Sequence, residues 1–135
     1  MMSETYAEIN VSVHQRVLVV TVVGAVDLES LQMAFGNIEK QVDLLVSPWA
    51  TLVDLRKWDL YTEEMIEPLA KFQLWLMEQG HKVEISVTGG SPLKQQARDA
   101  LWNHLKVAPD HKYVLTPEEG WQWLIREGYC EVAPS

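Results

Sequence analysis

Five carboxylates between residues 54 and 67 form the densest group of side chains that could do chemistry. They are Asp54, Asp59, Glu63, Glu64 and Glu67. Grouped carboxylates can hold a divalent cation or divide the work of a general acid and a general base. Such sites usually include a histidine or a second spaced carboxylate motif, and neither joins this group. We therefore expect solvated charges that complement a helix start, with no catalytic residue, metal or cofactor.

A second candidate is the turn Gly89-Gly90-Ser91, which precedes a predicted helix. Free N–H groups at a helix start can hold an anion or a phosphate group. The turn lacks the spacing of a P-loop or of a dinucleotide-binding fingerprint. We expect a turn with Ser91 as the helix cap, and an anion or ligand site at these three residues is the alternative.

The histidine and cysteine residues form no recognisable constellation. His14, His81, His104 and His111 show no ligand pair at helical spacing and no zinc motif, and we expect each at the surface. Cys130 has no apparent base partner and falls in a predicted C-terminal tail, which argues against nucleophilic catalysis. A single cysteine also excludes an intrachain disulfide, as is usual in the cytosol.

Composition narrows the class of function. The chain has 135 residues, of which 47% are hydrophobic, and this predicts one domain over 1–135 with flexible ends at 1–5 and 131–135. A net charge of −8 without a basic stripe argues against nucleic acid and against anionic membrane as partners. We expect no signal peptide and no membrane span, and hence a cytoplasmic protein of bacterial type.

Hydrophobic periodicity predicts the element order β-β-α-β-α-β-α-β-α. The predicted strands cover 7–14, 17–23, 49–55, 82–88 and 113–115. The predicted helices cover roughly 27–41, Thr62 to Gly80, Ser91 to about 105, and Thr116 to Gly128. Alternating strands and helices imply a mostly parallel sheet, and the opening hairpin adds one antiparallel edge.

Pro68 complicates the second helix, because proline costs about 3 kcal/mol in a helix interior. Either a short turn at 62–66 precedes the main helix, or the helix bends at Pro68.

This layout resembles a STAS domain, the SpoIIAA-like fold of anti-sigma-factor antagonists, over nearly the whole chain. Three segments carry the resemblance: Val17–Gly24 leading to a helix that starts at Asp27, the strand Leu52–Leu55, and the strand Val83–Thr88 followed by Gly89-Gly90. The resemblance implies an α/β fold with a mostly parallel sheet of about five strands, an antiparallel edge hairpin and four helices.

In that family a partner kinase phosphorylates a serine at the helix start that follows the third strand. The matching residues here are Thr62, Glu63, Glu64 and Met65, so the resemblance implies a divergent member without the phosphoacceptor serine. Glu63 stands at the serine position and would hold a permanent negative charge there. We expect the hydroxyl of Thr62 to be occupied in capping.

The resemblance implies a non-enzymatic regulatory module that binds a protein partner. We expect the contact surface to combine Asp27 with residues that follow the third strand. These are Arg56, Lys57, Trp58, Tyr61, Thr62 and Glu63. Two alternatives stay open: a small-ligand or lipid-binding domain with a pocket between apolar helix faces, and an enzyme that uses the cluster from Asp54 to Glu67.

Tryptophan side chains are candidates for a homodimer contact. Trp121 and Trp123 are two residues apart and cannot share one helix face, so we expect one of them at the surface or an interface. Trp58 falls in the predicted polar turn, where it either contacts a partner or covers the edge of the core.

Overall fold

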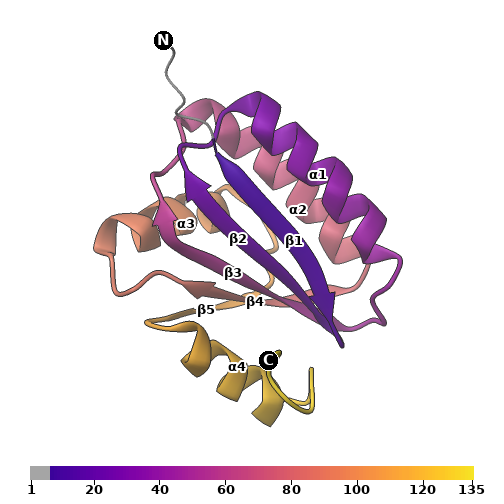
Figure 1. Ribbon diagram of the computed structural model, residues 1–135. Coiled ribbons are helices and arrows are strands. Elements are labelled where there is room, and N and C mark those ends of the chain that lie inside the picture. The colour runs from indigo at the N-terminus through magenta and orange to yellow at the C-terminus, as the bar shows by residue number, and fades with distance from the viewer. Residues whose placement is uncertain (1–6) are drawn as a thin grey trace.

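A five-stranded mixed sheet, in the spatial order β1-β2-β3-β4-β5, forms the centre of the protein (Figure 1). The computed structural model describes residues 7–135. β1 and β2 pair antiparallel, and the other neighbouring strands pair parallel. The strands are β1 Glu8–His14, β2 Val17–Gly24, β3 Trp49–Trp58, β4 His81–Val87 and β5 Asp110–Val114. The predicted α/β fold with an antiparallel edge hairpin is confirmed.

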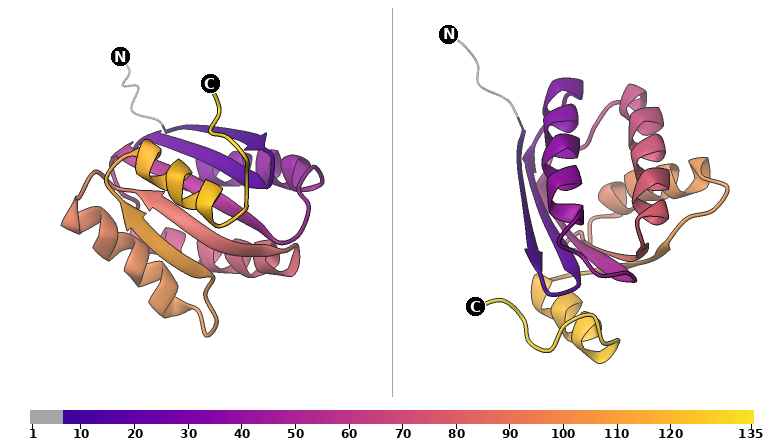
Figure 2. Two further views of the ribbon diagram at one scale, coloured as in Figure 1. Left: turned by 90° about the horizontal axis from the view of Figure 1, so that it is seen from below. Right: turned by 90° about the vertical axis from the view of Figure 1, so that its right-hand side faces the viewer.

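Helices cover both faces of the sheet. Figure 2 shows α1, α2 and α3 on one face and α4 on the other. The α-helices are α1 Leu28–Val42, α2 Ile66–Glu78, α3 Pro92–His104 and α4 Pro117–Arg126, and a 3₁₀ turn, η1, covers Glu63–Met65. Within residues 7–135, no helix combines the length and the apolar character that crossing a membrane requires.

Alternation along β3 divides the core between the two faces, because successive side chains of a strand point to opposite sides. Ala50 and Leu52 belong to a hydrophobic cluster that includes Leu124 of α4. Val53 and Leu55 belong to the cluster beneath α1 and α2. The long apolar run of β3 therefore reflects burial on both faces.

Three of the predicted helix caps are confirmed. Asp27 accepts a hydrogen bond from the Ser30 backbone N–H at 2.7 Å, and the Ser30 hydroxyl completes a capping box. The side chains of Ser91 and Thr116 cap α3 and α4 by accepting a backbone hydrogen bond, and each is followed by proline in the first turn. Local sequence thus fixes where these helices begin.

The start of α2 departs from the prediction for Thr62. The Thr62 side chain makes no capping hydrogen bond, so the expectation that capping occupies its hydroxyl is wrong. The 3₁₀ turn precedes α2, which confirms the first of the two alternatives for Pro68. Pro68 falls in the first turn of α2, where its missing N–H would have no intrahelical partner.

Two strand boundaries differ from the prediction by three residues, and the others differ by one residue at most. β3 continues past 55 to Trp58, because its backbone keeps pairing with β2 as far as Gly24. β5 begins at Asp110, which pairs with Val83, although its first side chains are polar and exposed. Backbone pairing does not require an apolar pattern, and the side chains are polar both at the end of the central strand β3 and at the start of the edge strand β5, so the pattern failed at both places.

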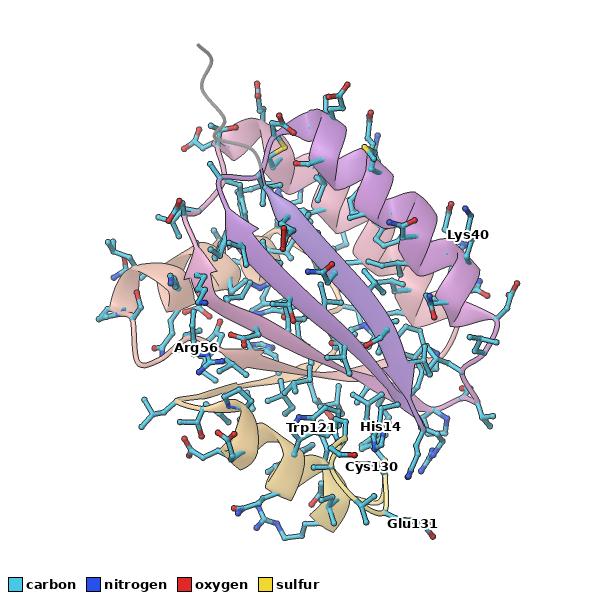
Figure 3. All side chains as sticks on the ribbon, viewed as in Figure 1. His14, Lys40, Arg56, Trp121, Cys130 and Glu131 are labelled. Atoms are coloured by element: carbon cyan, nitrogen blue, oxygen red, sulfur yellow. The ribbon has the colours of Figure 1, made fainter. Side chains whose placement is uncertain are left out.

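Cys130 lies in the core, and its predicted place in a tail is wrong. It is 5% exposed and packs with Tyr129 in the cluster on the α4 side of the sheet. Figure 3 shows Cys130 close to His14 and Trp121. The Glu131 backbone N–H donates to Gln15 Oε1 at 2.6 Å, which ties the chain after α4 to the β1–β2 turn. The flexibility of 131–135 stays a prediction.

Candidate functional site

A group of buried polar side chains lies on the face of the sheet that carries α2 and α3. We call it the buried polar network: Thr51, Gln73, His81, Glu84, Ser86 and Arg98, each between 0% and 8% exposed. Thr51 of β3 pairs directly with Glu84 of β4, so their side chains lie side by side. Sheet register therefore positions the centre of this network.

The carboxylate of Glu84 is the acceptor on which the network converges. Arg98 Nη2 donates to Glu84 Oε2 at 2.5 Å, and the Ser86 hydroxyl donates to the same oxygen at 2.8 Å. The Thr51 hydroxyl donates to Glu84 Oε1 at 3.5 Å. Two strands and one helix thus each contribute a hydrogen-bond donor to one carboxylate.

The remaining contacts fix the tautomer of His81. Gln73 Nε2 lies 2.8 Å from His81 Nδ1, and an amide nitrogen can only donate, so Nδ1 is the acceptor. His81 Nε2 therefore carries the proton and donates to Val83 O at 3.1 Å and to Thr51 Oγ1 at 3.0 Å. Because Nε2 is the donor, His81 cannot act as a base toward Thr51.

Burial and charge together set the protonation states. Burial lowers the pKa of His81 to about 4, so His81 is neutral at pH 7. Burial raises the pKa of Glu84, but the Arg98 charge and the hydrogen bonds outweigh it and hold that pKa below its usual value. The network is therefore electrically neutral at pH 7: one anion, one cation and neutral hydrogen-bonding groups.

A cavity of about 120 Å³ adjoins the network and is partly open to solvent. It lies between the sheet and α1, α2 and α3, and most of its lining is apolar. Its polar lining includes Thr51, Tyr61, Gln73, Glu84 and Arg98. The pocket that the small-ligand alternative requires is therefore present.

An aromatic stack bridges α1 and α2 beside this cavity. The rings of Phe35 and Phe72 lie 4.0 Å apart between centroids with an interplanar angle of 16°. Both residues line the cavity and both remain half-buried. The pair therefore stands between the cavity and solvent.

Most of the predicted contact residues lie at the surface at the carboxyl ends of β2 and β3. Asp27, Arg56, Lys57, Thr62 and Glu63 are exposed. The Asp59 backbone N–H donates to Gly24 O at 3.0 Å and so holds the two chain segments together.

Trp58 and Tyr61 differ from the other predicted contact residues. Trp58 is 3% exposed and packs at 5.0 Å against the half-buried ring of Tyr61. Trp58 belongs to the core, and its predicted place in a polar turn is wrong. Of the helical pair, Trp121 is buried and Trp123 keeps part of its surface exposed.

The Gly89-Gly90-Ser91 turn lies beside Arg56, which Figure 3 labels. Lys94 Nζ donates to Arg56 O at 2.6 Å and joins α3 to the end of β3. The backbone N–H groups of Gly90, Ser91 and Lys94 already donate to Thr88 or to Ser91 itself. An anion at this turn would compete with these bonds, and the site stays a prediction.

The acidic cluster does not converge in the structure. Asp54 makes a two-pronged ion pair with Arg56, at 3.0 Å from Nε and 2.8 Å from Nη2. Asp59, Glu63 and Glu64 are exposed. Across residues 7–135, no three histidine, cysteine or acidic residues are placed to hold a metal ion. The structure therefore does not bring these carboxylates together into the site that the enzyme hypothesis requires.

Sequence reasoning missed the buried polar network. It placed His81 at the surface, which is wrong, because His81 is 4% exposed and packs at 4.9 Å against Trp49. Glu84 lies between Val83 and Ile85 in the middle of a predicted strand, and this was the available signal. Its partner Arg98 lies on a helix and could not be identified without the fold.

The protonation of His81 leads to a prediction about stability. The histidine pKa is about 6.5 in an unfolded chain and about 4 in the folded protein. The unfolded state therefore binds more protons between these values, so stability falls as pH drops through this window. From pH 7 to pH 5 we expect His81 to cost about 2 kcal/mol of unfolding free energy. Urea denaturation at the two pH values measures this loss.

His81→Gln should remove that loss, whereas His104→Gln, at an exposed position, should keep it. The comparison stops at pH 5 because the pKa of Glu84 lies below its usual value. At lower pH the protonation of Glu84 therefore lowers the free energy of unfolding as well. An unchanged pH dependence in His81→Gln would contradict the assignment.

No family model matches the chain, and no curated protein matches it. Solved structures do match. An uncharacterised DUF3478 family protein with a SpoIIAA-like fold, from Shewanella loihica PV-4, has a TM-score of 0.69 at 18% identity and covers 92% of this chain and 98% of its own. An anti-sigma factor antagonist from Mycobacterium paratuberculosis has a TM-score of 0.53 at 16% identity, with 87% and 92% covered. The anti-sigma factor antagonist SpoIIAA in its unphosphorylated form has a TM-score of 0.59 at 12% identity, with 89% and 96% covered. With the sheet order above, these matches show that the chain folds as a SpoIIAA-like, STAS-like α/β domain.

Proposed function

We propose that the chain is a non-enzymatic regulatory module that binds a protein partner through the carboxyl edge of its sheet. We call this edge the carboxyl-edge surface: Asp27, Arg56, Lys57, Thr62 and Glu63. Support comes from the shared fold, because two solved structures that match are described as anti-sigma factor antagonists. Fold alone does not specify function, so the proposal depends on the surface itself.

The observation that carries the proposal is the fixed, charged character of this surface. The Arg56 side chain is 47% exposed, yet its guanidinium is held by two hydrogen bonds to Asp54. A side chain that is already ordered loses less entropy when a partner binds. Arginine at such a position is a frequent anchor of protein interfaces.

Glu63 adds an exposed negative charge to the carboxyl-edge surface. It is exposed at the first position of η1, where the resemblance expects a phosphorylated serine. A carboxylate there cannot be switched by a kinase, so the proposed module binds its partner constitutively. Cytoplasmic location and homodimer formation stay predictions.

Reversing the basic charges tests the surface. We expect Arg56→Glu/Lys57→Glu to abolish partner capture in a native pull-down with mass spectrometry. Breaking a buried or central charge pair of an interface costs about 2 kcal/mol or more of binding free energy, which lowers the affinity about 30-fold. Lys40→Glu/Lys112→Glu changes net charge equally at exposed positions on α1 and β5 and should retain capture. Glu63→Ala and Glu63→Ser should also weaken it. Equal capture by all these variants would contradict the proposal.

A second candidate function is the binding of a small apolar ligand, and the cavity of about 120 Å³ favours it. Most pockets that bind small molecules are apolar with a few convergent polar groups, as this one is. A well-packed core has few spaces larger than one water molecule, so this space needs an explanation.

The cavity makes a prediction about ligand-dependent stability. Cyclohexane at about 100 times its Kd should raise the unfolding temperature by about 10 °C, because a ligand stabilises the state that binds it. Ala34 lines the cavity and is 4% exposed. Ala34→Leu should fill the space and remove the shift, and Ala100→Leu, at an exposed position of α3, should keep it. A shift of equal size in Ala34→Leu would place the ligand elsewhere.

A further inference from the structure

We propose that a groove between α2 and the end of α3 is a second protein-binding surface, and that it takes a partner segment whose apolar side chains are flanked by carboxylates. The groove shares no residue with the carboxyl-edge surface or with the cavity lining, so the proposal is independent of both candidate functions. We call it the α2–α3 groove and define it by six of its lining residues: Ala70, Lys71, Leu74, Leu105, Lys106 and Val107.

The helix α2 is apolar on two sides, and the second side forms one wall of the groove. Leu69 and Leu76 line the cavity beneath the helix, on the face that α2 shares with α3 (Figure 2). Ala70 and Leu74 lie on another side of α2, because each residue of a helix turns by about 100°. Ala70 is 4% exposed and packs with Leu101 of α3. Leu74 extends past this contact and remains 46% exposed.

The chain that follows α3 forms the other wall. Leu105 is half-buried and packs against the same small cluster as Ala70. Val107 is 68% exposed and lines the groove together with Leu74. The groove therefore has an apolar floor and an exposed apolar residue on each side. Grouped apolar residues at a surface mark interaction sites, and the centre of a protein interface has this apolar character.

The rim of the groove is mainly basic, in a chain whose net charge is −8. Three basic residues, Lys71, His104 and Lys106, line it together with one acidic residue, Glu67. Lys71 Nζ lies 3.7 Å from Glu67 Oε1, and both side chains are largely exposed, so this pair contributes little and leaves Lys71 available to a partner. Within residues 7–135, neither His104 nor Lys106 forms an ion pair. Carboxylates on a partner would complement this rim.

The shape of the groove favours a polypeptide over a small molecule. Its volume is about 390 Å³, and six of its eight lining residues are exposed. A pocket for a drug-sized ligand covers most of the ligand surface, which so open a groove does not do. A chain that crosses the groove contacts both walls and continues beyond them. Apolar side chains then meet the floor, and flanking carboxylates meet the basic rim.

Three capped hexapeptides test charge and apolar character separately: Glu-Glu-Leu-Leu-Glu-Glu, Lys-Lys-Leu-Leu-Lys-Lys and Glu-Glu-Ser-Ser-Glu-Glu. In an NMR titration of the ¹⁵N-labelled full chain, we expect the first to bind at least about tenfold more tightly than either of the others. The largest shifts should occur at the backbone amides of Leu74, Lys106 and Val107. A net charge of −8 attracts the basic peptide, so preference for the acidic peptide requires a local basic site.

A matched pair of charge variants locates the basic site. Lys71→Glu/Lys106→Glu should lower the affinity for the acidic leucine peptide at least about tenfold. Lys40→Glu/Lys112→Glu changes the net charge equally at exposed positions outside the groove. This control should retain the affinity within about twofold, because salt screens distant charges.

A second matched pair tests the apolar walls. Leu74→Ser/Val107→Ser should lower the affinity for the same peptide about tenfold, because both walls lose their apolar contact. Leu44→Ser/Val46→Ser alters two residues that are 66% and 67% exposed in the loop between α1 and β3, and it should bind as the wild type does. All four positions are largely exposed, so the variants are expected to fold.

The remaining outcomes would overturn the proposal. These are no binding of any peptide, preference for the basic peptide, or equal binding of the leucine and serine peptides. Shifts centred on Arg56 and Lys57 would contradict the groove and leave the carboxyl-edge surface as the partner site. Phosphatidylglycerol vesicles provide the last comparison. If the chain binds these vesicles through Leu74 and Val107 and binds no peptide, the groove contacts a membrane and the protein partner is wrong.

Discussion

The hydrogen bond and charge pair between Glu84 and Arg98 is the interaction on which the rest of the structure depends. It joins β4 to α3 in the interior, and Ser86, Thr51, His81 and Gln73 extend it to β3 and α2. Desolvating two charges is expensive, so such a pair adds little net stability compared with a well-packed apolar pair. We infer that the pair contributes specificity, because the carboxylate and the guanidinium meet in one position of α3 on the sheet and would be left unpaired in others.

The same helix connects the interior to the surface. Arg98 of α3 lines the cavity, and one turn earlier Lys94 donates to the backbone of Arg56 on the carboxyl-edge surface. The cap at Ser91 fixes where α3 begins. The position of α3 therefore determines both part of the cavity lining and the support beneath an exposed arginine. The two proposed functions concern different atoms, and the fold brings them to successive turns on one face of α3.

The sequence predicts the fold because its local signals agree with its global pattern. β-branched residues in β2, the Asp27 and Thr116 caps, and the proline that follows Ser91 all indicate the elements that form. The site is harder to predict, since it depends on which side chains face each other. Glu84 and Arg98 carry no local sign of pairing, and the burial of His81 and Cys130 follows from tertiary contacts alone. The sequence predicts a polar turn at Trp58, but β3 pairs with β2 as far as this residue, and its side chain lies in the core, which fits the second of the two alternatives for Trp58.

A double-mutant cycle on Glu84 and Arg98, measured as unfolding free energy in urea at pH 7, tests the central claim most directly. Each single substitution, Glu84→Met or Arg98→Met, leaves one buried charge unpaired and should cost about 3–5 kcal/mol. The double substitution should cost far less than the sum, because it leaves neither charge, and the coupling free energy should exceed about 2 kcal/mol. Additive losses from the two single substitutions would show that the pair is not the interaction that holds α3 on the sheet.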